Sequence, residues 1–130
     1  MNVLVTGANG FIGRALCSRL ASDNKMVGVD ITGPADEALN IAWERADLTD
    51  SDSVAAFCEK YSLDIVIHCA GIAHQKIGSV DAATYMRVNS KATETLAKAA
   101  VESNPDIKFI FLSSVSVYGE GPQITQITAD

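Results

Sequence analysis

The stretch Val3-Leu-Val-Thr-Gly-Ala-Asn-Gly-Phe-Ile-Gly13 decides the fold that this sequence predicts. Apolar residues directly after the first methionine are typical of a buried strand, and the three glycines then turn the chain into an amphipathic helix. Gly7 allows a sharp exit from the strand, and Gly10 lets backbone approach a ligand without a Cβ in the way. Gly13 permits close packing of the helix on the strand. The stretch therefore predicts a nucleotide pyrophosphate site.

The residues that follow the glycines support this interpretation. Backbone N–H groups of the first helical turn, at about Phe11 and Ile12, would point at an anion, helped by the positive end of the helix dipole. The next apolar run, residues 26–29, ends in Asp30. A glycine turn alone is weak evidence, but a strand before it, a helix after it and an acid at this place favour a dinucleotide site.

Composition limits the class of protein. The 130 residues suit one domain, and 48% of them are hydrophobic, as expected of a folded globular chain. The net charge of −6 argues against nucleic-acid and membrane-surface partners, because both need clustered Lys and Arg.

The cysteines and the N-terminal residues bear on the compartment. Cys17, Cys58 and Cys69 are odd in number, lie in apolar segments and lack metal-ligand spacing, so we expect no disulfide framework and no metal site. We see no signal-peptide pattern and no apolar run of membrane-spanning length. We therefore expect a soluble cytoplasmic protein.

Apolar runs alternate with segments of helical periodicity along the chain. The tail from 115 to 130 has no clear period and is expected to form a loop. The second helix is expected to begin with an N-cap at Thr49 or Ser51. Ile12, Ala15, Leu16 and Leu20 should form the apolar face of the first helix, and Tyr85, Val88, Ala92, Leu96 and Ala99 that of the last. Strands are expected at 2–6, 26–29, 40–46, 64–69 and 107–113, and helices at about 11–22, after 51, and at about 80–103.

This alternation predicts the α/β class, with a Rossmann-type doubly wound parallel sheet in the strand order 3-2-1-4-5, truncated after the fifth strand. One face of the sheet should then be bare at the fifth strand. Ligands of such sheets lie at the carboxyl ends of the strands, where the strand order reverses. Five segments should meet there: the glycine turn, Asp30, Asp47-Leu48, Cys69-Ala70-Gly71 and Ser113-Ser114.

The chain resembles the N-terminal portion of an extended short-chain dehydrogenase/reductase, in the family of NAD-dependent nucleotide-sugar epimerases and dehydratases. The resemblance covers almost the whole chain. It rests on TGANGFIG at 6–13, Asp30, Asp47-Leu48, HCAG at 68–71, VNSKATETLAKAA at 88–100 and FLSSVSVYG at 111–119.

The resemblance implies a role for each motif in binding NAD. Phe11 and Ile12 would meet the pyrophosphate, within the turn formed by Gly7, Asn9, Gly10 and Gly13. Asp30 would hold the adenosine ribose hydroxyls and would repel a 2′-phosphate, so NAD is favoured over NADP. The alternative for Asp30 is a solvated acid at a strand end.

Two further motifs would complete the cofactor site. Asp47 would accept a hydrogen bond from the adenine amino group and the Leu48 N–H would meet a ring nitrogen, although an Asp before a helix is often a cap. Asn89 matches the Asn of the family's long helix, and a surface Asn is its alternative. The wall beside the nicotinamide ribose would comprise Cys69, Ala70, Gly71, Ile72 and Ala73.

The catalytic set is incomplete in this chain. Ser114 matches the Ser or Thr that polarises the reacting oxygen of the substrate, with a turn residue as the alternative, and Tyr118 matches a structural Tyr. His68 is expected to pack at the strand end, whereas His74 could approach substrate. The family transfers a hydride with the help of a Tyr and a Lys four residues later. The residues four positions after Tyr61, Tyr85 and Tyr118 are Ile65, Asn89 and Pro122.

We therefore expect residues 1–130 to be the NAD-binding Rossmann part of a longer enzyme that acts on a nucleotide sugar, and to be inactive alone. The parent enzyme is expected to be a homodimer. The alternative is a module without catalysis that senses a dinucleotide or binds a partner.

Overall fold

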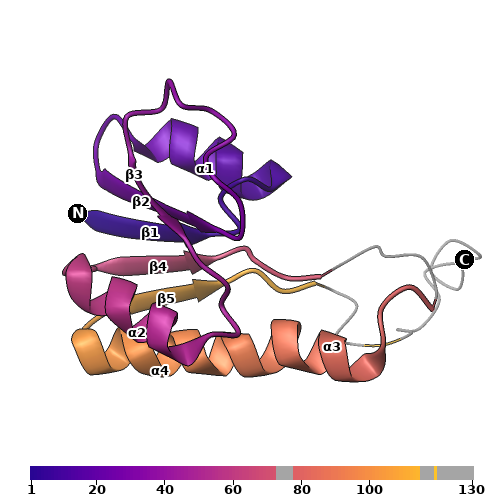
Figure 1. Ribbon diagram of the computed structural model, residues 1–130. Coiled ribbons are helices and arrows are strands. Elements are labelled where there is room, and N and C mark those ends of the chain that lie inside the picture. The colour runs from indigo at the N-terminus through magenta and orange to yellow at the C-terminus, as the bar shows by residue number, and fades with distance from the viewer. Residues whose placement is uncertain (73–77, 115–118, 120–130) are drawn as a thin grey trace, which may run out of the picture.

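The computed structural model describes residues 1–72, 78–114 and 119 of the chain. A five-stranded sheet forms the central layer, with α1 on one face and α2 and α4 on the other (Figure 1). The elements in chain order are β1 (Asn2–Thr6), α1 (Phe11–Leu20), β2 (Lys25–Asp30), β3 (Ala42–Arg45), α2 (Ser51–Lys60), β4 (Ile65–His68), α3 (Ala82–Met86), the π-helical turn η1 (Arg87–Lys91), α4 (Ala92–Ser103) and β5 (Lys108–Phe111).

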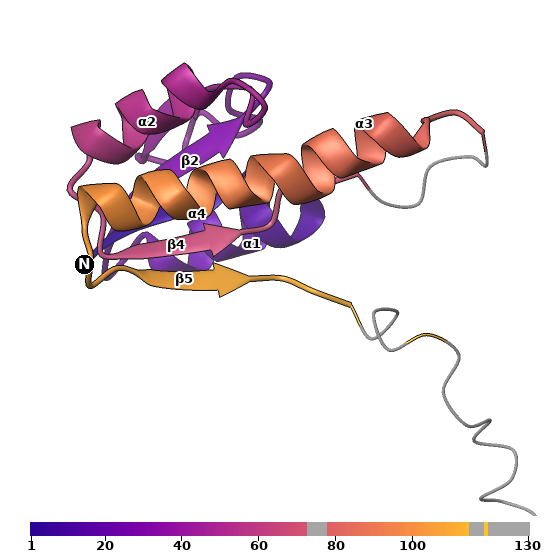
Figure 2. The same ribbon diagram turned by 90° about the horizontal axis from the view of Figure 1, so that it is seen from below.

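The sheet has the predicted topology. Its strand order is β3-β2-β1-β4-β5, and every neighbouring pair is parallel. The strand order reverses between β1 and β4, so the ends of these two strands flank the place where such folds bind ligands. The helical rod of α3, η1 and α4 runs beneath β4 and β5, and α3 extends past the ends of the strands (Figures 1 and 2).

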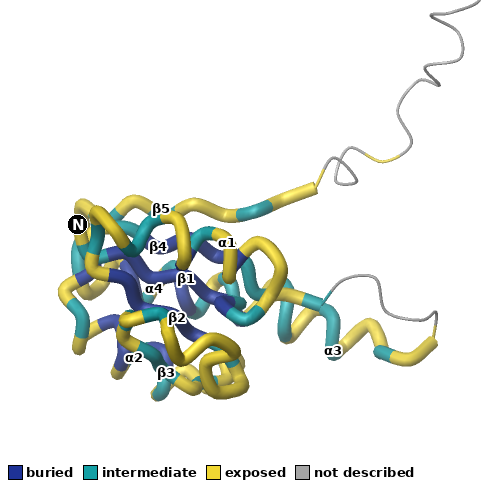
Figure 3. The backbone as a smooth tube through the Cα atoms, turned by 90° about the horizontal axis from the view of Figure 1, so that it is seen from above, coloured by how far each residue is buried: buried dark blue, intermediate teal, exposed yellow. Residues whose placement is uncertain are grey.

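Alternation along the strands divides the core into two apolar layers. Leu4 packs with Phe57 and Leu96 against α2 and α4, whereas Val5 packs with Cys17 against α1. The central strands are therefore buried on both faces (Figure 3). At β5, Ile110 and Phe111 are half exposed, as expected near the bare edge, whereas Phe109 packs against the core.

The predicted face of α1 was partly wrong. We expected Ile12, Ala15, Leu16 and Leu20 to face the sheet. Leu16 and Leu20 do pack against the apolar layer on this face, but Ala15 is exposed and Ile12 is 49% exposed. The fully buried residues of the helix are Gly13 and Cys17. A Cβ on Gly13 would lie 2.1 Å from the Gly7 carbonyl oxygen, so only glycine fits at this point of contact between α1 and the turn. Because Gly13 faces the turn, the buried face of α1 is rotated from the predicted one.

The other helices also differ in detail from the predictions. The N-cap of α2 is Asp50, between the two candidates Thr49 and Ser51, and its carboxylate accepts from the amides of Asp52 and Ser53. The expected long helix contains the π-helical turn η1, which sequence periodicity did not reveal. The buried residues of α4 are Ala92, Leu96 and Ala100, and the predicted Ala99 packs partly buried against the same core.

Candidate functional site

The glycine turn follows β1 directly and lies against the end of β4. Gly7 has a φ of +64°, and a Cβ there would lie 2.8 Å from the Ala70 nitrogen, so both conformation and space require glycine. Gly13 packs on the turn, as predicted. Gly10 is the N-cap of α1 and supplies no side-chain hydrogen bond to the helix. The first amides of α1 are therefore left without a side-chain cap at the carboxyl end of β1.

Phe11 and Ile12 occupy the first turn of that helix. Their side chains point away from the core, with Phe11 95% exposed. Any contact with an anion would therefore use their backbone N–H groups, as the sequence analysis expected.

Asp30 ends β2 opposite the glycine turn. Its Oδ2 accepts a hydrogen bond from the Asn9 backbone N–H at 3.0 Å, and Oδ1 accepts longer bonds from the N–H and hydroxyl of Thr32. The side chain of Asn9 binds the loop after β2: Nδ2 donates to Thr32 Oγ1 and to the Gly33 carbonyl, and Oδ1 accepts from Ala35. Asn9 thus ties the glycine turn to Asp30 and its loop.

Asp47 and Leu48 follow β3. Oδ1 of Asp47 accepts from the backbone N–H of Thr49 at 2.9 Å and from its hydroxyl at 2.7 Å. These hydrogen bonds, led by that of the hydroxyl, and the charge of Arg87 lower the pKa of the Asp47 carboxyl. Both bonds end on Oδ1, so Oδ2 keeps its capacity to accept. The carboxylate therefore shapes a local turn and still offers an acceptor. It is not the helix cap of the alternative interpretation, because the N-cap of α2 is Asp50.

The segment after β4 is fixed by Asn89 on η1. Asn89 Oδ1 accepts from the Ile72 N–H at 2.7 Å, and Nδ2 donates to the Ile72 carbonyl at 2.8 Å. A Cβ on Gly71 would lie 3.1 Å from Asn89 Oδ1. Asn89 is therefore not a surface residue without a role: it clamps the backbone of the predicted wall.

These elements enclose one cleft of about 420 Å³ at the carboxyl ends of the strands. Of the predicted cofactor-binding residues, those that line it are Gly7, Gly10, Asp30, Asp47, Leu48, Cys69, Ala70, Gly71 and Ile72. Asn9, Gly13 and Asn89 are adjacent through the contacts above, and Phe11 and Ile12 stand at the start of α1. The structure thus brings four of the five predicted segments together, and Ser113-Ser114 is the exception.

Sequence reasoning missed part of the lining. The further residues are Val29, Ile31, Ala46, Thr49, Arg87, Val88 and Ala92. The η1 turn places Arg87 and Ala92, five residues apart, on the same wall, which α-helical spacing does not predict. The one available signal was the motif at 88–100, which contains Asn89 and Ala92 and which Arg87 directly precedes.

The predicted catalytic residue lies apart from the cleft. Ser114 is exposed after β5 and is not among the residues that line the cleft in the described part of the chain. Ala73, His74 and Tyr118 lie outside the described residues, as does nearly all of the tail from 115 to 130.

The cysteines and His68 favour their neutral forms. Burial raises the pKa of the Cys69 thiol, and raises those of Cys17 and Cys58 to about 11. Burial also lowers the pKa of His68. All three cysteines are free thiols. These shifts give no thiolate nucleophile at the site.

Residues 1–72, 78–114 and 119 contain neither a metal-binding cluster nor a membrane-spanning helix. They contain no cluster of three His, Cys, Asp or Glu side chains that could hold a metal ion. Within the same residues, none of the helices combines the length and apolar character that crossing a bilayer requires.

Comparison with known proteins identifies the family. A model of the NAD dependent epimerase/dehydratase family matches residues 3–130. The chain belongs to this family. The resemblance drawn from the motifs is thereby confirmed.

Relatives of this family member include sugar-nucleotide enzymes. It is 27% identical to the dTDP-glucose 4,6-dehydratase of Haemophilus influenzae over 92% of its own length, and 30% identical to the UDP-glucose 4-epimerase of Bacillus subtilis over 100%. It spans 41% of the length of each of these relatives.

Solved structures agree with the family and with the fold. UDP-glucose 4-epimerase of Thermus thermophilus, in complex with NAD, is similar with a TM-score of 0.82 and 27% identity over 95% of this chain and 41% of that one. The Brucella ovis enzyme, also in complex with NAD, has a TM-score of 0.81 and 29% identity over 95% of this chain and 38% of that one.

Proposed function

We propose that residues 1–130 are the NAD-binding domain of a nucleotide-sugar epimerase or dehydratase. One observation carries the proposal: in a chain of the NAD dependent epimerase/dehydratase family, the glycine turn, Asp30 and Asp47 open into a single cleft where the strand order reverses. The cleft lies where the fold places a dinucleotide. Relatives named as sugar-nucleotide epimerases and dehydratases support the substrate class.

The residues present fit the cofactor. The N-terminus of α1 has no side-chain cap, so the amides of Phe11 and Ile12 suit the pyrophosphate. Glycine at positions 7 and 10 allows backbone to approach it. Both oxygens of Asp30 can accept, as a ribose diol requires. These assignments follow the sequence analysis.

The remaining cofactor contacts divide between adenine and nicotinamide. Asp47 Oδ2 and the Leu48 N–H would pair with adenine, beside the apolar residues Ala46 and Val88 of the same cleft. Residues 69–73 would form the wall beside the nicotinamide ribose, and within this segment Ile72 is clamped by Asn89. Small side chains there let backbone come close.

The charge around Asp30 favours NAD over NADP. Asp30 would repel a 2′-phosphate, and its register partner on β3 is a cation, Arg45. The Nε of Arg45 donates to the Ile31 carbonyl at 3.1 Å, which fixes one of the guanidinium's donors on the loop after β2. Sequence reasoning considered only positions 31 and 32 and overlooked Arg45.

The proposed activity belongs to a longer protein. Held in this cleft, NAD would supply the hydride-transfer chemistry at a sugar carbon. Ser114 would help polarise the reacting oxygen, and a Tyr-x-x-x-Lys pair, absent from these 130 residues, would move the proton. We propose that this protein forms a homodimer in the cytoplasm, where its free thiols would persist.

Calorimetric titration of the 130-residue chain with NAD and NADP tests the cofactor assignment. We expect measurable NAD binding and weaker NADP binding. Tighter binding of NADP would contradict the role of Asp30, and no binding of either would overturn the proposed function.

A turnover assay with UDP-glucose and dTDP-glucose tests the remaining claim. The 130-residue chain should convert neither sugar nucleotide above the blank, because it lacks the proton-transferring pair. Turnover by this chain alone would show that the chemistry uses other residues.

A further inference from the structure

Two strand-end residues form a buried polar pair beneath the cleft. Thr6 ends β1 and His68 ends β4, and they are register partners, so their side chains lie on the same face of the sheet. Thr6 is 0% exposed and His68 1%. His68 Nδ1 lies 2.6 Å from Thr6 Oγ1, and its Nε2 lies 2.8 Å from Thr93 Oγ1 of α4.

The hydrogen-bond partners allow one arrangement of protons. Thr93 Oγ1 donates its single proton to the Asn89 carbonyl at 3.0 Å, so it must accept from His68 Nε2–H. Nδ1 is then without a proton and accepts from the Thr6 hydroxyl, whose oxygen accepts from the Ala70 N–H at 3.2 Å. Every donor and acceptor is used when His68 is neutral.

The two ends of this chain of hydrogen bonds reach the same segment. One end holds the Ala70 N–H through Thr6. The other holds the Asn89 carbonyl through Thr93, and the Asn89 side chain clamps both backbone groups of Ile72. Ala70 and Ile72 are therefore fixed from beneath by one continuous network.

We propose that Thr6, His68 and Thr93, here called the relay, are positioning residues that set the backbone of Ala70–Ile72 for the nicotinamide half of the cofactor. The inference rests on the proposed function, since it assigns this segment to that half. None of the three needs to touch the cofactor. Around the His68 ring the contacts are the two threonines and the rings of Phe109 and Phe111, which give it no competing charged partner among the described residues.

The test removes one hydroxyl of the relay. Thr93→Val keeps the shape of the side chain but leaves His68 Nε2–H and the Asn89 carbonyl without their partner. In the chain without ligand, hydrogen exchange of the Ala70 and Ile72 amides should speed up about five- to tenfold, the effect of losing one hydrogen bond. Thr93→Ser should restore the slow exchange. Affinity for NAD should fall by a similar factor, while that for AMP, which lacks the nicotinamide half, should stay unchanged.

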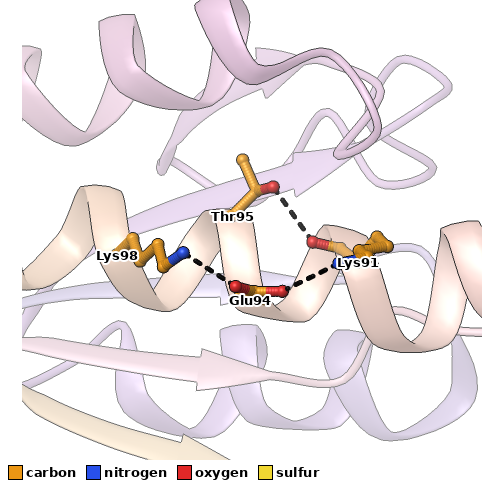
Figure 4. Close-up of polar contacts among 4 residues, drawn as sticks. All are labelled: Lys91, Glu94, Thr95 and Lys98. Carbon is orange, nitrogen blue, oxygen red and sulfur yellow. Dashed lines mark hydrogen bonds and ion pairs between the residues drawn. The ribbon is translucent and has the colours of Figure 1, made fainter.

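Thr95→Val is the matched control. Thr95 lies on the same helix, and its hydroxyl donates to the Lys91 carbonyl at 3.0 Å, the same type of bond to a residue four positions earlier. Figure 4 shows it beside the Lys91, Glu94 and Lys98 side chains, with its hydroxyl directed at the Lys91 carbonyl. This variant should change neither exchange nor affinity.

The outcomes separate the relay from the proposed function. Unchanged exchange at Ala70 and Ile72 in Thr93→Val, equal effects in both valine variants, or an equal loss of AMP and NAD binding would overturn the relay. If the wild-type chain binds no NAD, the proposed function fails and the exchange rates still decide whether the relay holds the segment. Should Thr93→Val not fold, Thr93→Ala gives the same readout.

Discussion

The two sides of the cleft are built in different ways. The adenosine side, comprising Asp30, Asp47 and Leu48, contains two local turns, Asp47 to Thr49 and Asp30 to Thr32, and one longer link, from the Asn9 N–H to Asp30, 21 residues along the chain. The nicotinamide side, Ala70–Ile72, is held by Thr6, 64 residues from Ala70, and by Asn89, 17 residues from Ile72.

This difference has a consequence for how each side forms. Local turns need only the nearby chain, whereas the nicotinamide side has its geometry only when β1, β4 and the helical rod are all in place. We therefore expect the nicotinamide side to respond to changes in the core, and the adenosine side to respond to changes of its own charges.

The largest effect is expected for Gly13→Ala, which should disturb both sides of the cleft at once. The new Cβ would lie 2.1 Å from the Gly7 carbonyl oxygen, so α1 and the turn must move apart. We expect the free energy of unfolding to fall by about 3 kcal/mol. Urea unfolding followed by circular dichroism measures it.

Gly33→Ala is the control for that substitution. A Cβ at Gly33 meets nothing within 4 Å, so this variant should be close to wild type. Equal stability of the two alanine variants would show that the turn is less tightly packed than its geometry indicates.

The second prediction concerns the adenosine side alone. Asp30→Asn removes the charge and keeps the shape, so hydrogen bonds to a ribose diol become neutral and weaker. NAD affinity should fall about tenfold. The preference for NAD over NADP should be smaller than in wild type, because Asn does not repel the 2′-phosphate of NADP. Calorimetry measures both affinities.

Asp36→Asn controls for the loss of one negative charge. Asp36 lies in the exposed loop after β2, and its Oδ1 accepts from the Ala38 N–H. The variant should bind NAD as wild type does. A loss equal to that of Asp30→Asn would indicate a general charge effect and no specific contact.

The same contrast explains how much could be predicted from sequence. Local patterns predicted the strand order and the positions of the glycine turn, Asp30 and Asp47. Apolar runs, glycines and acids at strand ends can be interpreted from the residues next to them in the sequence. The confirmed fold rests on these. Their binding roles remain predictions.

The missed features depend on partners far along the chain. The rotation of α1 follows from the contact between Gly13 and Gly7, and η1 places Arg87 and Ala92 on one wall. His68 was expected only to pack at a strand end. Its two hydrogen bonds need Thr6 and Thr93, 62 and 25 residues away, so no local pattern indicates them.

The third prediction separates stability from binding. Asp50→Ala removes the carboxylate that accepts from Asp52 and Ser53 at the start of α2, which should lower the urea midpoint of unfolding, though by less than Gly13→Ala does. Asp50 does not line the described cleft, so NAD affinity should be unchanged. Asp52→Asn, a change within the first turn that keeps the cap, serves as the control. A tenfold loss of NAD affinity in Asp50→Ala would show that α2 positions the adenosine side.

The smallest expected effect is a difference between the two sides of the cleft in how their contribution to stability depends on pH. Burial lowers the pKa of His68 below its ordinary 6.5, so the unfolded chain binds a proton there more readily than the folded chain. The stability from neutral His68 is therefore complete above pH 6.5 and is lost as the pH falls below it. The pKa of Asp47 is lowered from 3.8 by its hydrogen bonds to Thr49, so its contribution survives to much lower pH.

Urea unfolding between pH 8 and pH 5 tests this difference. The wild-type free energy of unfolding should be flat down to about pH 6.5 and then decline, while His68→Gln should decline less because Gln cannot take up the proton. The two proteins are compared by the slope of their free energy of unfolding against pH, since the substitution itself lowers stability at every pH. Parallel slopes would show that protonation of His68 does not cause the decline.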